Sequence, residues 1–182
     1  MQATELLREQ VKQVHQFVES IMAPVTPDQA HWAPPGSLVN SLGGNYAHIL
    51  VTEDVVIHTL LNDREPLFAS SWAGKTGLSA LPPMPAPESP GLPSWQAWST
   101  QVAIDLSVLR SYAQATYAAT DEYLAALSDD QLSQTVDVSR TGLEGVRTIQ
   151  RILSSIIVGH AYSHAGEIAC LKGLQGMKGY VH

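Results

Sequence analysis

Two histidines four residues apart lie in an apolar stretch near the end of the chain. His160 and His164 are part of the run RILSSIIVGHAYSHAGEIACL. Four residues are slightly more than one helical turn, so both imidazoles project from nearly the same side of a helix. The other residues on that side are apolar: Leu153, Ile156, Ile157, Ile168 and Leu171. Burying polar rings without partners is costly, and a metal ion bound through neutral imidazole would satisfy both.

A catalytic site of the zinc type needs about three protein ligands, so a third must come from a facing helix. His48 is the best candidate, because it lies in the middle of another apolar helical segment, NYAHILVTEDVV. Helical bundles build metal sites in this way. Three imidazoles suit zinc, nickel, iron or copper; we expect a divalent ion, zinc or nickel first, with iron and manganese as further candidates. The alternative is three ordinary histidines hydrogen-bonded to carbonyls or carboxylates.

Glu167 is the candidate catalytic residue. It follows His164 by three residues and can therefore face the same cavity. Its carboxylate has three candidate roles: a fourth metal ligand, a general base, or a group that orients an imidazole. A solvent-exposed helix charge without a role in the site is the alternative.

Four long segments with helical periodicity must position these residues. They span about residues 4–22, 38 or 41 to 61, 94–127 and 146–171. Ser94 is the predicted cap of the third, whose inner face begins with Trp95 and Trp98. We expect these two indoles to anchor that helix and not to contact a substrate. The pattern predicts an all-α fold, a four-helix bundle.

Residues 73–93 form the longest irregular stretch, and six prolines lie between Pro82 and Pro93. Neither a helix nor a central strand accommodates that density of proline. We interpret the stretch as a long proline-rich crossover loop between the second and third helices. Neither flank is long enough for an independent core, so residues 1–182 are expected to form a single domain.

Composition and charge narrow the classes of partner. Ten Lys and Arg against 17 Asp and Glu give a net charge of −7, which argues against binding nucleic acid or an anionic membrane. No apolar run is long enough to span a membrane, and the first residues lack the pattern of a secretory signal. We therefore expect a cytoplasmic protein.

Several motifs are absent from the sequence. Cys170 is the only cysteine, which excludes an internal disulfide and Cys-x-x-Cys zinc sites; we expect it to be a small buried residue. The histidine pair reads HAYSH and lacks the glutamate of the HExxH zinc proteases. No phosphate-binding glycine motif occurs, so chemistry driven by nucleotides is not expected.

Four segments together resemble the DinB-like (DinB/YfiT-like) superfamily of four-helix metalloenzymes, and the resemblance covers nearly the whole chain. These segments are TPDQAHWAPPGS at 26–37, SLGGNYAHILVTED at 41–54, LSDDQLSQTV at 127–136 and HAYSHAGEI at 160–168. By this likeness the metal ligands are His48, His160 and His164.

The family has a serine seven residues before its first metal histidine and a glutamate five after it, which Ser41 and Glu53 match. Glu53 lies off the stripe of His48, so we expect it to form a cap or an ion pair. Two positions depart from the family pattern: Glu167 stands where many members have Gln, and Ser163 where many have a second histidine.

Relatives characterised in this superfamily include thiol-dependent S-transferases and isomerases, which use small thiols such as mycothiol or bacillithiol. The resemblance implies a small-molecule substrate, a low-molecular-weight thiol, and a thiolate nucleophile attacking an electrophile. It also implies a homodimer, since relatives often dimerise. Two alternatives stay open: a metal-dependent hydrolase, and a non-catalytic, stress-related metal-binding bundle whose site is closed by a fourth ligand, Glu167.

Overall fold

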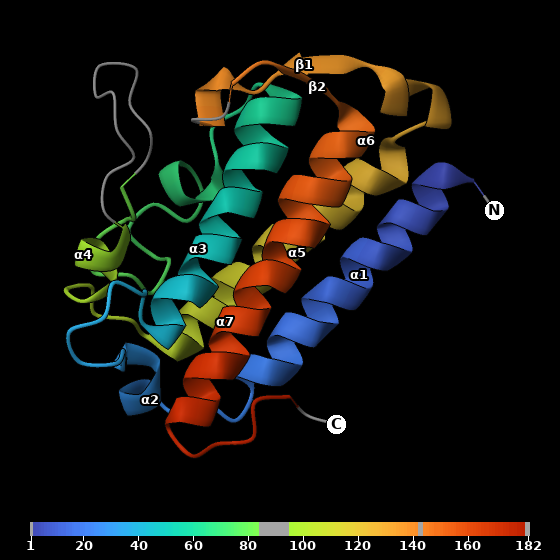
Figure 1. Cartoon of the computed structure of the whole chain (residues 1–182). Coiled ribbons are helices and arrows are strands. Elements are labelled where there is room, and N and C mark those ends of the chain that lie inside the picture. The colour runs from blue at the N-terminus through green and yellow to red at the C-terminus, as the bar shows by residue number, and fades with distance from the viewer. Residues whose placement is uncertain (1, 84–94, 142–143, 181–182) are drawn as a thin grey trace.

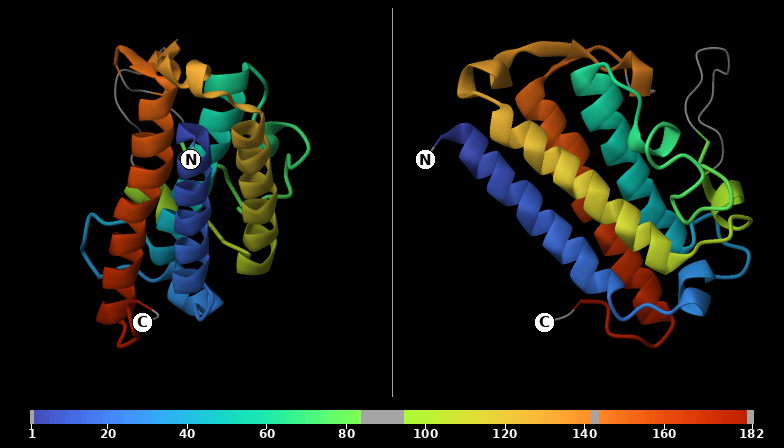
Figure 2. Two further views of the ribbon diagram at one scale, coloured as in Figure 1. Left: turned by 90° about the vertical axis from the view of Figure 1, so that its right-hand side faces the viewer. Right: turned by 180° about the vertical axis from the view of Figure 1, so that it is seen from behind.

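The computed structural model describes residues 2–83, 95–141 and 144–180, and the chain is mainly helical (Figure 1). The four long helices are α1 (Ala3–Met22), α3 (Leu42–Asp54), α5 (Leu106–Ala126) and α7 (His160–Leu174). They lie side by side, and each of α1 and α3 packs against both α5 and α7 (Figure 2). The predicted helical fold is confirmed at this level. No helix among the described residues is long and apolar enough to cross a membrane.

Shorter elements connect and cover the long helices. They are α2 (Pro27–His31), the 3-10 turns η2 (Leu67–Ala69), η3 (Asp129–Ser133) and η4 (Ser139–Thr141), α4 (Trp95–Ser99), and strands β1 (Thr135–Asp137) and β2 (Val146–Thr148). The strands form an antiparallel hairpin in which Val136 pairs with Arg147. The hairpin lies across one end of the helices, near the N-terminus, and the C-terminus lies at the other end (Figure 1).

Both helices that carry the histidines contain a π-helical segment. Helix α3 continues into η1 (Val55–Leu60), and α7 follows the short helix α6 (Ile149–Arg151) and η5 (Ile152–Gly159). The fourth helical segment was predicted to begin at about residue 146, but residues 146–148 form β2. Thr148 caps the helix instead, accepting a hydrogen bond from the backbone N–H of Arg151. Because a π-helix closes i to i+5 bonds, these segments change the direction in which later side chains project.

The prediction of one helix over residues 94–127 was wrong. Helix α4 ends at Ser99, and α5 begins only at Leu106. Asp105 causes the break, because its carboxylate accepts hydrogen bonds from the N–H groups of Ser107 and Val108 and so caps α5. Its own N–H donates to the Gly77 carbonyl at 2.8 Å, which ties the intervening chain to the preceding loop.

The proline-rich stretch lies mostly outside the described residues. Residues 84–94, including the predicted cap Ser94, belong to this part, so the crossover loop stays a prediction.

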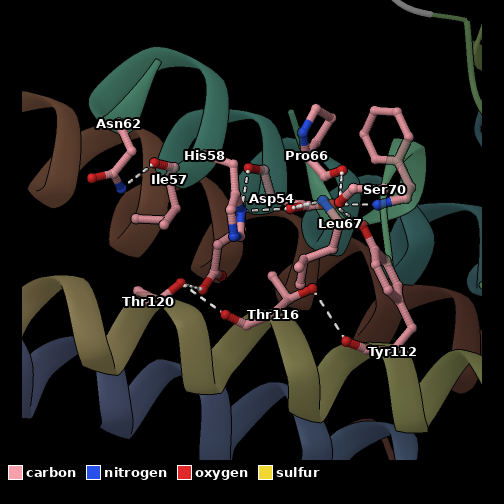
Figure 3. A network of polar contacts seen from close by, with 12 residues as sticks. Asp54, Ile57, His58, Asn62, Pro66, Leu67, Ser70, Tyr112, Thr116 and Thr120 are labelled. Atoms are coloured by element: carbon pink, nitrogen blue, oxygen red, sulfur yellow. Dashed lines mark hydrogen bonds and ion pairs between the residues drawn. The ribbon is translucent and has the colours of Figure 1, made fainter. Parts of the chain in front are cut away.

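Two adjacent acidic residues near the end of α3 are buried, Glu53 at 2% exposure and Asp54 at 0%. Glu53 contacts His15 Nε2 at 2.9 Å and accepts a hydrogen bond from Thr120, so of the two predicted roles its contacts fit pairing and not capping. Asp54 lies between η2, α5 and its own helix (Figure 3). Its oxygens accept from the N–H groups of Leu67 and Phe68 at 2.9 and 3.1 Å, respectively.

Two side chains complete the partners of Asp54. The Tyr112 hydroxyl donates to it at 2.6 Å, and His58 Nδ1 lies 2.7 Å from it. These contacts fasten η2 and α5 to the end of α3, and thereby fix the helix that carries His48.

Candidate metal centre

The structure brings the three predicted histidines together. His48 of α3 meets His160 and His164 of the first turns of α7, and one ring nitrogen from each lies within 4.8 Å of the others. The Nε2 atoms of His48 and His160 are 2.9 Å apart. Ring centroids are separated by 4.4 to 4.7 Å. Three nitrogen donors from two facing helices therefore converge on one small volume.

Local structure explains these positions. Ser41 caps α3, accepting a hydrogen bond from the Gly44 N–H, so that His48 falls about two turns into the helix. His160 is the first residue of α7, directly after η5. The α-helical spacing from there places His164 one turn further along the same face. The packing of α3 on α7 then closes the triad.

Burial keeps two of the rings neutral. Loss of solvation and the nearby His164 lower the pKa of His48 to about 4. Burial, followed by the charges of His164 and His48, lowers the pKa of His160 to about 3. Both rings are therefore uncharged at neutral pH, which is the form that binds metal ions. The Nδ1 atom of His48 is buried and has no hydrogen-bond partner.

Glu167 contacts the far side of one imidazole. Its Oε2 lies 2.7 Å from His164 Nδ1, and its side chain is 54% exposed. A carboxylate there accepts a hydrogen bond from Nδ1–H, which leaves the lone pair of His164 on Nε2 and fixes the direction of the ring. Of the roles considered for Glu167, orienting the imidazole is the one that this contact fits. Among the described residues, His48, His160 and His164 form the one cluster of three or more potential metal ligands, and Glu167 is not part of it.

The donor set fits a divalent metal ion. Without one, Nε2 of His48 and Nε2 of His160 face each other at 2.9 Å, and one of them must donate an N–H hydrogen bond to the other. A cation shared by both would accept the two lone pairs at once. The Glu167 contact already holds His164 in the tautomer that is protonated on Nδ1, so its Nε2 lone pair is also free to bind the ion.

Two expectations, that Trp95 anchors the predicted third helix and that Cys170 is buried, were wrong. Trp95 belongs to the separate helix α4, and its ring centroid lies 4.1 Å from that of His48 in an edge-on arrangement. The indole therefore borders the histidine cluster. Cys170, expected to be buried, is exposed. The sequence offered no local signal for Trp95, because the contact depends on how α4 packs against α3.

A model of the DinB superfamily matches residues 10–168, a range that contains all three histidines. The chain belongs to the DinB superfamily. Its structure is similar to the crystal structure of a conserved protein from Enterococcus faecalis, with a TM-score of 0.74 and 26% sequence identity over 96% of this chain and 97% of that one. A comparison with curated proteins finds no match. The predicted family is thus confirmed.

Replacing Glu167 with Ala is expected to weaken metal binding about ten- to a hundredfold, because His164 loses the acceptor that holds its tautomer. Glu167→Gln is expected to restore most of the affinity, since an amide oxygen still accepts the Nδ1–H bond. Competition with a chromophoric chelator measures both affinities. Equal, unchanged affinities in the two variants would show that the carboxylate is only a surface charge.

Proposed function

We propose that this member of the DinB superfamily is a metal-dependent enzyme that transfers a small thiol to an electrophilic small molecule. The observation that carries the proposal is the convergence of three imidazole nitrogens from α3 and α7, two of them on rings kept neutral by burial. The family resemblance supplies the thiol and the transfer reaction.

The three histidines would hold a divalent ion, with zinc or nickel as the first candidates. Such an ion, when bound, supplies Lewis acidity that lowers the pKa of a thiol or a water molecule. The chain itself contributes the donor geometry, the low charge of the rings and the fixed direction of His164. Three protein ligands leave a coordination position open, as in catalytic zinc sites.

The reaction balances without a redox partner. A bond forms between the thiol sulfur and the electrophilic carbon, and the leaving group departs with the electron pair of the bond that breaks. The thiol proton passes to solvent or to the leaving group. Glu167 is held against His164, so we assign it the positioning of that ring and not the removal of the proton.

The contact of Glu167 also bears on the alternative of a purely structural metal. A closed structural site needs a fourth protein ligand, and Glu167 was the obvious one. Its carboxylate instead contacts His164 Nδ1, the nitrogen not available to the ion in this tautomer. This arrangement supports an open position and therefore a catalytic role.

Protein loaded with Co(II) tests the proposal. Addition of 2-mercaptoethanol is expected to produce an intense sulfur-to-cobalt absorption band in the near ultraviolet, because the thiol enters the open position. A loaded protein whose cobalt spectrum responds to neither thiol nor azide would have a closed, structural site. A response to azide alone, together with metal-dependent ester hydrolysis, would favour the hydrolase.

A further inference from the structure

Helix α4 is fastened to the first turn of α3. The Ser41 N–H donates to Ser99 Oγ at 3.1 Å, and the Ser41 hydroxyl donates to the Ser99 carbonyl at 3.1 Å. Ser99 is only 2% exposed. A Cβ atom at Gly44 would lie 2.5 Å from the Ser99 Cβ. The absence of a side chain at Gly44 therefore permits the close approach of α4, one turn before His48.

This anchoring brings an aromatic pair to the histidine cluster. Trp95, the first residue of α4, has its ring 4.1 Å from the ring of His48 at an interplanar angle of 69°. Trp98 lies 5.5 Å from Trp95, centroid to centroid, and its indole N–H donates to the Ala80 carbonyl at 3.0 Å. The second indole is thus held by the preceding loop, and it lies against the first.

The side of the cluster formed by His48 is therefore bordered by an apolar aromatic surface, and the side formed by His164 by the Glu167 carboxylate. Aromatic rings prefer offset-stacked or edge-to-face neighbours.

We propose that Trp95 forms the wall of the ligand position at the three-histidine cluster and selects thiols whose substituent is flat and unsaturated. This inference rests on the proposed thiol-dependent function and adds a specificity-determining residue to it. The contact favours an aromatic substituent over a short hydrophilic one, because only the former gains stacking contact with the indole while its sulfur occupies the open position.

The test compares two thiols of similar acidity, benzyl thiol and 2-mercaptoethanol, by titrating the Co(II)-loaded protein and following the sulfur-to-cobalt band. Trp95→Ala is expected to weaken the binding of benzyl thiol about two- to tenfold and to leave the binding of 2-mercaptoethanol nearly unchanged. Trp95→Phe is expected to retain most of the preference. Gly44→Ala is expected to shift the preference as Trp95→Ala does, because the added Cβ forces α4 away while the indole remains in the chain.

Trp72→Phe is the matched control. Trp72 packs against Tyr112 at 5.7 Å, and its replacement should change neither titration. Tryptophan fluorescence gives a second measurement. Bound Co(II) should quench less of the total emission in Trp95→Phe than in wild type, and Trp72→Phe should not show this loss of quenching.

The outcomes distinguish the role of Trp95 from the thiol-dependent function. If Trp95→Ala weakens the binding of both thiols equally, or changes the binding of neither, Trp95 does not select the thiol. The proposed thiol-dependent function would be unaffected by that result. Absence of a sulfur-to-cobalt band with either thiol in wild type would overturn both.

Discussion

Replacing His160 with Ala is expected to lower the metal content of the purified protein from about one ion per chain to below about one-tenth. The physical reason is the loss of one of three donors. His48 and His164 would remain, but two imidazoles without a preorganised third donor bind a divalent ion weakly at the trace concentrations of a purification. Elemental analysis of both proteins after identical dialysis gives the comparison.

His58→Gln is the matched control for this experiment. His58 also lies on the helix that begins with α3, but it pairs with Asp54 at 2.7 Å and stands outside the cluster. Glutamine still offers a donor to that carboxylate, so the fold and the metal content should be preserved. Equal, negligible metal in wild type and in His160→Ala, each incubated with Zn(II) and Ni(II) before dialysis, would remove the metal centre and the functional proposal with it.

The ligand triad was accessible from the sequence because it depends on short spacing and on helix type. The four-residue interval between His160 and His164 fixes two rings on one face of any helix. The prediction that His48 is the third ligand required only that its helix pack against the helix of His160 and His164. The π-helical segments left no such signature, since their apolar residues fit an α-helix equally well. In the structure, η5 ends at Gly159 and α7 begins at His160.

Helix α4 shows why the rest could not be predicted. The periodicity of residues 94–127 is compatible with one helix, and nothing local forbids it. The break comes from the capping carboxylate of Asp105 and from the bond of its N–H to Gly77, 28 positions earlier in the chain. The approach of Ser99 to Gly44 is likewise long-range. These distant contacts bring Trp95 to the histidine cluster, whereas the local pattern predicted that it lies on the inner face of a single long helix.

The buried acids of α3 connect the site to the stability of the fold. The position of Glu53 off the His48 stripe predicted a cap or an ion pair, whereas the sequence around Asp54 predicted no role for it. Yet Asp54 is the more heavily bonded of the two, with donors from η2, from α5 and from its own helix. An ionised carboxylate accepts only, and each of its partners is a donor.

Asp54→Asn is therefore expected to destabilise the protein by about 2–4 kcal/mol, although the side chain keeps its shape. One carboxylate oxygen becomes an amide that donates, and it then faces another donor in a fully buried position. Urea unfolding followed by circular dichroism measures the loss. Asp121→Asn is the matched control: Asp121 pairs with Arg8 at 2.6 Å on the surface, where the same substitution should cost far less because water replaces the lost partner.

The pH dependence of the free energy of unfolding distinguishes loss of the pairing between Asp54 and His58 from a general loss of packing. The hydrogen bond to Asp54 raises the pKa of His58 above its ordinary 6.5, against the smaller lowering effects of burial and Arg64. Protonated His58 therefore adds stability that is fully present below about pH 6.5 and is lost as pH rises through the folded pKa. The stability gap between wild type and Asp54→Asn should be wider at pH 6 than at pH 9. A gap that stays constant over this range would mean that the neutral hydrogen bonds of Asp54, and not its pairing with His58, hold the end of α3 in place.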